Sequence, residues 1–467
     1  MAQHTVEKIG GTSMTQFDRV VKNVIIQDRS GEDLYQRIFV VSAYGGITDL
    51  LLEGKKTGIP GIYGRFAGTD TSWRDALEDV RSTMKRINAD MAPLGLDSAE
   101  ADAFVDERLG GVSECLRSLQ RLCSFGHFEL SDYLPTVREM ISSVGEAHSA
   151  YNAALILQQQ GVNAVFVDLT GWQEKANLDF DEVISRGFDG LNLATQLPIA
   201  TGYTKCAEGI MGTYDRGYSE ITFSKIAVLT DALEGIIHKE FHLSTGDPKL
   251  IGEDSVQVIG ATNFDVADQL ADLGMEAIHP RASKAMEAKG ISIRVKNTFE
   301  PDHEGTVISS SYASPQPRVE MVTGRRAMVG IEVVDPDMVG QSGFDYRLLA
   351  VFAKYGISYV AKNTNANTIT HYVPLSVRNL DACLEELDAT FPSAAVRTCP
   401  VTMVCAIGSN MQVPGLLATS ATALADAGIN VIAICQCMRQ VNMQFVVSEG
   451  DFESAQVALH RALVEQV

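Results

Sequence analysis

The chain has 467 residues, which at about 150 residues per domain suggests roughly two to four domains. Its hydrophobic share of 45% and charged share of 21% are ordinary for a globular protein with a sizeable core. The formal net charge of −21 argues against a nucleic-acid or anionic-membrane partner, since both would repel the chain. It still allows an anionic substrate, because a local basic pocket can outweigh the overall charge.

The cysteines and the N-terminus indicate a cytoplasmic protein. Eight cysteines are scattered without a Cys-x-x-Cys pair, which fits a reducing compartment better than a disulfide framework. Cys435 and Cys437 share one face of a strand, but no matching Cys/His pair follows, so core packing is favoured over a metal site. We find neither a signal peptide nor a stretch of about 18 apolar residues that could span a bilayer.

The first 300 residues alternate between strand and helix patterns, which predicts a mostly parallel sheet with helices on both faces. Apolar residues 17, 20, 21 and 24 form a helical stripe after the first strand. Two charge-rich helices are expected at about 71–92 and 98–124, and another at 147–160. The predicted strands are 5–9, 37–42, 163–167, 197–201, 235–238 and 256–259.

The remainder of the chain is repetitive. Residues 309–318 are rich in Ser and Pro and are typical of a linker. Two successive stretches then show the same order of strands and helices, with a helix ending at Gly356 in the first and Gly428 in the second. Two tandem βαββαβ units are the simplest description. We therefore expect three domains, at 1–310, 322–393 and 398–467.

The elements predicted within the two units follow the same order in each. The first unit has strands at 327–334, 357–361 and 368–373 and a helix at 378–391, and the second has strands at 401–407, 429–435 and 443–447 and a helix at 452–464.

The first stretch that could take part in binding or catalysis is residues 8–13, the turn that follows the first strand. Gly10 and Gly11 let the backbone turn tightly and approach a ligand, and the next helix would present free N–H groups to an anion. Lys8 adds a positive charge. This is not a Walker P-loop, because the Gly-Lys-Ser/Thr order is absent. An ordinary Gly-Gly turn remains the alternative.

Three further stretches carry polar groups that suit an anionic or zwitterionic ligand. Glu146, in the run 143–149, could bind a substrate ammonium group, or could merely cap the start of a helix. Arg216, in the loop 212–220, could grip a carboxylate or a phosphate with two hydrogen bonds, or could be an exposed arginine. The turn 243–249 ends in Lys249 and has low specificity alone.

Together these residues resemble the aspartokinase branch of the amino-acid kinase family. The family's opening Lys-Phe-Gly-Gly-Thr-Ser corresponds to 8–13, and its Val-Ser-Ala strand end to 41–43, with Thr48 shortly after. Its Ser-x-Gly-Glu-x-x-Ser matches 143–149. The order is collinear from residue 6 to about 308, and the two C-terminal repeats resemble tandem ACT domains. Further matches are 215–220 for Gly-Arg-Gly-Gly-Ser-Asp, 245–249 for Thr-Asp-Pro-Arg, and 278–281.

The resemblance implies an enzyme that uses ATP and Mg²⁺ to phosphorylate the side-chain carboxylate of L-aspartate. Lys8 would stabilise the transferring phosphoryl group, Glu220 would orient Lys8 or the metal, and Arg216 would clamp an aspartate carboxylate. The remaining expected aspartate-site residues are Ser42, Thr48, Glu146, Gly217 and Ser219. The remaining expected ATP-site residues are Gly10, Gly11, Ser13, His238, Lys239, Ser244, Asp247 and Lys249.

Several positions depart from the family pattern. Glu220 stands where Asp is usual, Tyr218 where Gly is usual, and Lys249 where Arg is usual. Residues 237–242 replace Trp-Thr-Asp-Val-Asp-Gly, which puts the adenine and ribose contacts in doubt. The stretches 4–8 and 238–242 instead resemble the subgroup associated with ectoine synthesis.

Two other functions stay open on these residues. One is a related kinase that acts on glutamate or another small acid, and the other is an inactive kinase fold kept as an amino-acid sensor. The ACT-like repeats imply an amino-acid effector, with the loop 409–415 as a candidate contact, or a role limited to dimerisation. We expect a homodimer or a higher homo-oligomer.

Overall fold

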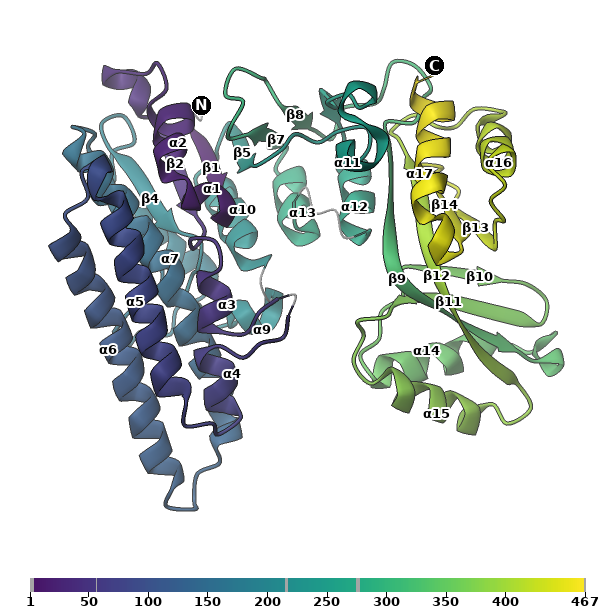
Figure 1. Cartoon of the computed structure of the whole chain (residues 1–467), viewed down its shortest axis with the longest axis horizontal. Helices are drawn as coiled ribbons and strands as arrows, with labels where there is room; N and C mark the ends of the chain where they lie inside the picture. Colours follow the sequence, from purple (N-terminus) through teal and green to yellow (C-terminus); the bar gives the residue numbers. More distant parts are fainter. Residues whose placement is uncertain (1–3, 56, 215–216, 274–277, 466–467) are drawn as a thin grey trace. The chain divides into compact units, whose positions relative to one another are not determined.

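The computed structural model describes residues 4–55, 57–214, 217–273 and 278–465. The chain forms two compact units (Figure 1). The first contains Met1–His242 and Ile278–Ser310, and the second contains Leu243–Ala277 and Ser311–Val467. The segment 243–277, which we expected within the first domain, thus belongs to the second unit. Within the described ranges, no helix has both the length and the apolar character needed to cross a membrane.

A mostly parallel sheet forms the centre of the first unit, as predicted. Its strand order within the unit is β3-β4-β2-β1-β5-β7-β8, and only β8 runs antiparallel to its neighbour. All five residues of β2 are buried, as expected for a central strand covered on both faces. The strands are β1 (Thr5–Ile9), β2 (Arg37–Val41), β3 (Ala164–Val167), β4 (Leu197–Thr201), β5 (Glu234–Lys239), β7 (Ser292–Asn297) and β8 (Thr306–Ile308).

Helices surround this sheet. The two predicted charge-rich helices are confirmed as α5 (Trp73–Met91) and α6 (Ser98–Cys123), which lie alongside part of α7 (Leu134–Gln159) in Figure 1. The apolar stripe after β1 forms two short pieces, α2 (Phe17–Val20) and a π-helical turn (Val21–Ile26), instead of one helix. The others are α1 (Gly11–Thr15), α3 (Ile47–Leu51), α4 (Ile62–Ala67), α8 (Phe180–Phe188), α9 (Ile210–Tyr214), α10 (Tyr218–Leu229) and α13 (Pro280–Ala288).

Helix α7 corrects one prediction that matters for the site. It begins at Leu134, with a proline in its first turn, so Glu146 lies in the middle of the helix and is not a capping residue. The run before Glu146 suggests a helix start because it contains Ser and Gly, but these small residues serve packing. A Cβ on Gly145 would lie 2.9 Å from the Cβ of Ala43, so α7 approaches the loop after β2 closely.

The second unit is built on one antiparallel sheet with the order β10-β11-β9-β12-β14-β13. The predicted strand at 256–259 is wrong, since only an isolated bridge joins Val258 to Ser244. The elements are α11 (Pro248–Ile251), β6 (Ala261–Thr262), α12 (Phe264–Asp272), β9 (Met321–Val334), α14 (Phe344–Lys354), β10 (Ala361–Thr364), β11 (Thr368–Pro374), α15 (Leu380–Thr390), β12 (Ala395–Ile407), α16 (Leu416–Asp426), β13 (Ala433–Gln436), β14 (Asn442–Val447) and α17 (Phe452–His460).

Strands β9 and β12 run through both repeats. Residues 328–334 of β9 pair with 395–401 of β12, and residues 321–325 pair with 403–407 across a register shift. The second repeat ends in α17 and a π-helical turn, with no strand after them in the described chain. The start of β9 therefore supplies the strand that this repeat lacks. The predicted α/β domain followed by ferredoxin-like repeats is confirmed, with this exchange of one strand.

Three apolar clusters hold this sheet. One joins the first repeat's strands to α14 and α15, another joins the second repeat's strands to α16 and α17, and a third packs β9 and β12 against α12. Phe445 on β14 is fully buried in the second cluster. Truncation of such a side chain leaves a cavity that the surroundings fill only in part.

We expect Phe445→Ala to lower the free energy of unfolding by about 3–5 kcal/mol, because it removes a fully buried aromatic ring. Urea unfolding followed by circular dichroism measures the change. Met438→Ala is the control, since Met438 is 96% exposed in the same repeat. Equal unfolding midpoints for the two variants would contradict this packing.

Candidate active site

Lys8 and Glu220 form a buried ion pair at the centre of the first unit. Lys8 lies on β1, and its Nζ is 3.1 Å from Oε1 of Glu220 on α10. The backbone N–H of His279 donates to the other oxygen of Glu220, at 2.5 Å. Burial opposes ionisation of Glu220, but Lys8, Lys239 and this N–H together hold its pKa below the ordinary value. The pair is therefore charged, and it fixes an ammonium group beside the glycine turn.

Glu146 is the second buried carboxyl group of the site. The hydroxyl of Ser219, one residue before Glu220, donates to its Oε1 at 2.6 Å. Its Oε2 is buried and has no hydrogen-bond partner. Burial raises the pKa of Glu146 to about 8, although Ser219 and the charge of Lys8 act in the opposite direction. A cation bound beside such a carboxyl group would stabilise its ionised form, so the group favours binding of a cation.

Gly202, which follows β4, makes room for this carboxyl group. A Cβ at Gly202 would lie 2.8 Å from Oε2 of Glu146 and 2.9 Å from the Cβ of Ser219. Any side chain here would displace the unpartnered oxygen. We did not predict Gly202, because a glycine after a strand is too common to signal a site.

The glycine turn is held by close backbone contacts. The N–H of Gly10 donates to the carbonyl of His238 at 3.3 Å. A Cβ on Gly11 would lie 2.7 Å from the carbonyl oxygen of Ala43, so only glycine fits. Ser13 is fully buried, and its Oγ is 3.0 Å from Oγ1 of Thr298. Its hydroxyl is thus engaged inside the protein.

Ser42 directly follows β2, and Thr48 lies in the first turn of α3. The carbonyl of Ser42 accepts a hydrogen bond from Ser149 on α7 at 2.9 Å, and its N–H donates to Ile9. Thr48 is half-buried on α3, which packs against α7. The segment 42–48 is therefore fixed to the helix that carries Glu146.

Other predicted residues are distributed differently. Arg216 lies outside the described residues. Gly217 precedes α10, and a Cβ there would meet the ring of His279 at 2.5 Å. His238 directs its imidazole to Glu7, on the sheet face opposite Lys8. Lys239 is on the same face as Lys8, as the register of β1 and β5 requires.

Ser244, Asp247 and Lys249 belong to the second unit. The carboxylate of Asp247 caps α11 by accepting the N–H of Lys249 at 2.9 Å, and the hydroxyl of Ser244 donates to the carbonyl of Gly246 at 2.7 Å. These contacts shape a tight turn before α11.

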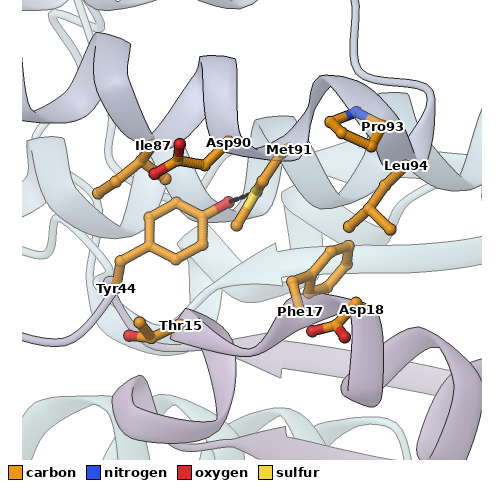
Figure 2. Close-up of a pocket in the computed structure, with 9 residues that line it drawn as sticks. All are labelled: Thr15, Phe17, Asp18, Tyr44, Ile87, Asp90, Met91, Pro93 and Leu94. Carbon is orange, nitrogen blue, oxygen red and sulfur yellow. Dashed lines mark hydrogen bonds between the residues drawn. The ribbon is translucent and has the colours of Figure 1, made fainter.

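A pocket of about 290 Å³ lies elsewhere in the first unit (Figure 2). Figure 2 shows Tyr44 and Met91 in contact across it, with a hydrogen bond of 3.2 Å from the phenol to the sulfur. Thr15, also on its wall, binds the carbonyl of Gly11 and the N–H of Gly45. None of the predicted site residues lines the pocket. Its wall contacts the glycine turn through Thr15, which donates to the carbonyl of Gly11.

The described residues contain no group of three or more His, Cys, Asp or Glu side chains that could hold a metal ion.

Comparison with known proteins places this geometry in a family. The model of the amino acid kinase family matches residues 3–297, and a model of the ACT domain matches residues 404–463. Aspartate kinase Ask_Ect from Stutzerimonas stutzeri (strain A1501) is 52% identical over 464 residues, which cover 99% of this chain and 98% of that protein. Aspartokinase 1, chloroplastic, from Arabidopsis thaliana is 24% identical, over 98% of this chain and 80% of its own length.

Solved structures have the same fold. E. coli aspartokinase III in complex with lysine and aspartate has a TM-score of 0.71 at 19% identity, covering 99% of this chain and 100% of its own. The same enzyme in complex with aspartate and ADP has a TM-score of 0.69 at 20% identity, covering 98% and 99%.

The raised pKa of Glu146 predicts a pH-dependent stability. Its pKa is about 8 in the folded protein against an ordinary 4.5, so the folded state binds more protons between these values. Stability should therefore fall as pH rises from about 5 to about 8, and Glu146→Gln should remove that loss. Thermal midpoints of both proteins without ligand, measured across this range, test it. The thermal midpoint of the wild-type protein should fall further below that of Glu146→Gln as pH rises, and a constant difference would contradict the assignment.

Proposed function

Because the chain belongs to the amino acid kinase family, and within it to the aspartate kinases, we propose that Lys8, Glu146 and Glu220 form its active site. The reaction is the ATP-dependent phosphorylation of the side-chain carboxylate of L-aspartate, which yields 4-phospho-L-aspartate. The identity of 52% to Ask_Ect over nearly the whole chain also supports the subgroup associated with ectoine synthesis. The observation that carries the site is a buried lysine, Lys8, paired with Glu220, next to Ser219, whose hydroxyl donates to the buried carboxyl group of Glu146.

Lys8 acts on the phosphoryl group. The side-chain carboxylate of aspartate has an ordinary pKa of about 3.9, so it is ionised at neutral pH and needs no general base. The difficulty is the approach of two anions, which positioning and charge neutralisation overcome. Glu220 and the N–H of His279 hold Lys8 in place, so that its ammonium group meets the charge that develops on the transferring phosphoryl oxygens.

Glu146 binds the ammonium group of aspartate. Its unpartnered Oε2 lies in the space that Gly202 leaves open. Arrival of a substrate cation favours the ionised carboxylate, so aspartate binding releases a proton from Glu146. Ser219 orients the carboxyl group, and Ser42 and Thr48 supply hydroxyl groups. Arg216 clamps a carboxylate of the substrate.

ATP phosphates lie at the glycine turn. Gly10, Gly11 and the N–H of Ser13 present backbone donors at the start of α1, and Lys239 extends the nucleotide site within the same unit. The roles expected from the sequence for Ser244, Asp247 and Lys249, which belong to the second unit, stay predictions. Mg²⁺, held mainly by phosphate oxygens and water, neutralises the phosphate charge when it is bound. The imidazole of His238 is engaged by Glu7, so this residue contributes its backbone to the turn.

The second unit regulates and assembles the enzyme. Its two repeats, at about 322–393 and 398–467, act as a pair of ACT domains that bind an amino-acid effector at the loop 409–415. They also pair between chains in a homodimer or a higher homo-oligomer. Support comes from the edge strand β13, which exposes Ile434, and from Ile432 just before it.

Lys8→Ala should lower kcat/KM for aspartate by a factor of about 10² to 10³, because it removes a preorganised cation from the phosphoryl group. An ATP- and aspartate-dependent acyl-hydroxamate assay, run also with glutamate and with no acceptor, measures both the loss and the acceptor. Lys225→Ala is the control. Lys225 lies on the same helix as Glu220, but its ammonium group pairs with Asp181 on α8, away from Lys8. Near-normal turnover of Lys8→Ala would remove Lys8 from the mechanism.

Arg216→Ala should raise the KM for aspartate and lower kcat, since it deletes a bidentate clamp on the substrate carboxylate. Steady-state kinetics at saturating ATP separate the two constants, with Arg186→Ala as a surface control. Unchanged aspartate constants would exclude Arg216 from the site.

A further inference from the structure

The strand that carries Lys8 holds a second buried charge on its other face. Side chains alternate along a strand, so Glu7 points away from Lys8, and only 3% of its surface is exposed. Burial opposes ionisation of this carboxyl group, but Arg37 and His238 hold its pKa well below the usual range. Specific partners thus stabilise this charge in the interior, and none of the roles proposed above involves Glu7.

Four hydrogen bonds saturate the carboxylate of Glu7. Arg37 donates from Nε to Oε1 at 2.7 Å and from Nη2 to Oε2 at 3.2 Å. Thr5 donates its hydroxyl to Oε1 at 3.0 Å, and Nε2 of His238 is 2.7 Å from Oε2. Because an ionised carboxylate only accepts, Nε2 of His238 carries a proton. Every lone pair is thus directed at a fixed donor, which leaves the carboxylate one orientation.

This cluster joins three neighbouring strands and the segment after the glycine turn. Glu7 lies on β1, Arg37 on β2 and His238 on β5, which flank β1 on either side. Arg37 also donates to the carbonyls of Val24 and Ile25, at 2.7 and 2.8 Å. The helical segment that starts at Gly11 is therefore fixed at its far end to the same carboxylate.

His238 connects the cluster to the glycine turn. Its side chain binds Glu7 on one face of the sheet, and its carbonyl accepts the N–H of Gly10 at 3.3 Å. The next residue, Lys239, lies on the face of Lys8 and helps to hold Glu220 ionised. A shift of β5 relative to β1 would consequently move Gly10 and Lys239 with respect to Lys8.

We propose that Glu7 and His238 are positioning residues for phosphoryl transfer, which keep β5 and the glycine turn in register with Lys8. The inference rests on the roles given above to Lys8 and Gly10. A buried ion pair adds little net stability compared with apolar packing, so geometry is the better account of this one.

His238→Leu and His238→Gln test the proposal. Leu removes the donor, and we expect kcat to fall by a factor of about 10 to 100, as for a misplaced reacting group. The KM for aspartate should stay within a factor of about three, because Glu146 on α7 binds that substrate. Gln places an N–H close to the position of Nε2, so it should recover most of the lost kcat.

Asp168→Asn is the matched control. Asp168 pairs with buried Arg108 at 2.6 Å in the same unit, and neither residue lies on β1 or β5. This variant should lower the thermal midpoint without changing kcat. Equal kcat losses for the Leu and Gln variants, or a normal kcat for both, would overturn the positioning role.

Glu7→Asp decides the matter if His238→Leu does not fold. It keeps the charge but draws the carboxylate back by one carbon, so that Arg37 and His238 cannot both be reached, and kcat should fall. An unchanged kcat would refute the proposal. An incorrect assignment of the active site can be told apart from this result, because in that case Lys8→Ala would have normal turnover.

Discussion

One buried ammonium group, that of Lys8, governs the charge of the catalytic unit. It pairs with Glu220 at 3.1 Å and also favours the ionised form of Glu146, but the two carboxyl groups are stabilised unequally. Glu220 has Lys239 and a backbone N–H as further support, whereas Glu146 has the hydroxyl of Ser219 and an Oε2 without a hydrogen-bond partner. The ionised form of Glu146 therefore stands to gain more from a further cation than that of Glu220 does. The ammonium group of aspartate, which we propose to bind there, would supply such a cation.

Much of the fold could be predicted from local patterns. Strands β1 and β4 have the predicted boundaries, and β2 ends one residue early. The near-continuous apolar run of β2 is typical of a strand in a parallel sheet that is covered on both faces. The start of α7 was missed because the Ser and Gly residues before Glu146 suggest a helix start, whereas Gly145 packs against Ala43, about 100 positions away in the sequence. The strand expected at 256–259 is apolar enough, but it finds only a single bridging partner.

The site was predictable where a motif carries its own chemistry. Lys8 meets Glu220, as expected, whereas the contact between Ser219 and Glu146, both expected near the substrate, was not itself predicted. The replacement of Asp by Glu at 220 raised a doubt about reach, and the structure removes it, since the longer side chain contacts both Lys8 and the N–H of His279. The use of His238 was not foreseeable, because its partner Glu7 is set by the register of two strands far apart in sequence. The identity of 52% with a named aspartate kinase favours aspartate kinase activity over the two alternatives, an amino-acid sensor and a kinase for another small acid.

The strands shared by the two ACT-like repeats bear on how the chain is made. Residues 321–325 leave the ribosome before their strand partner, residues 403–407 of β12. Until then the N–H of Val322 can bond to the carbonyl of Thr245, but the edge that will face β12 is unpaired, and such an edge can recruit other chains. Pairing across about 80 residues is also slow compared with local helix formation. The sheet of the second unit is therefore completed late in synthesis.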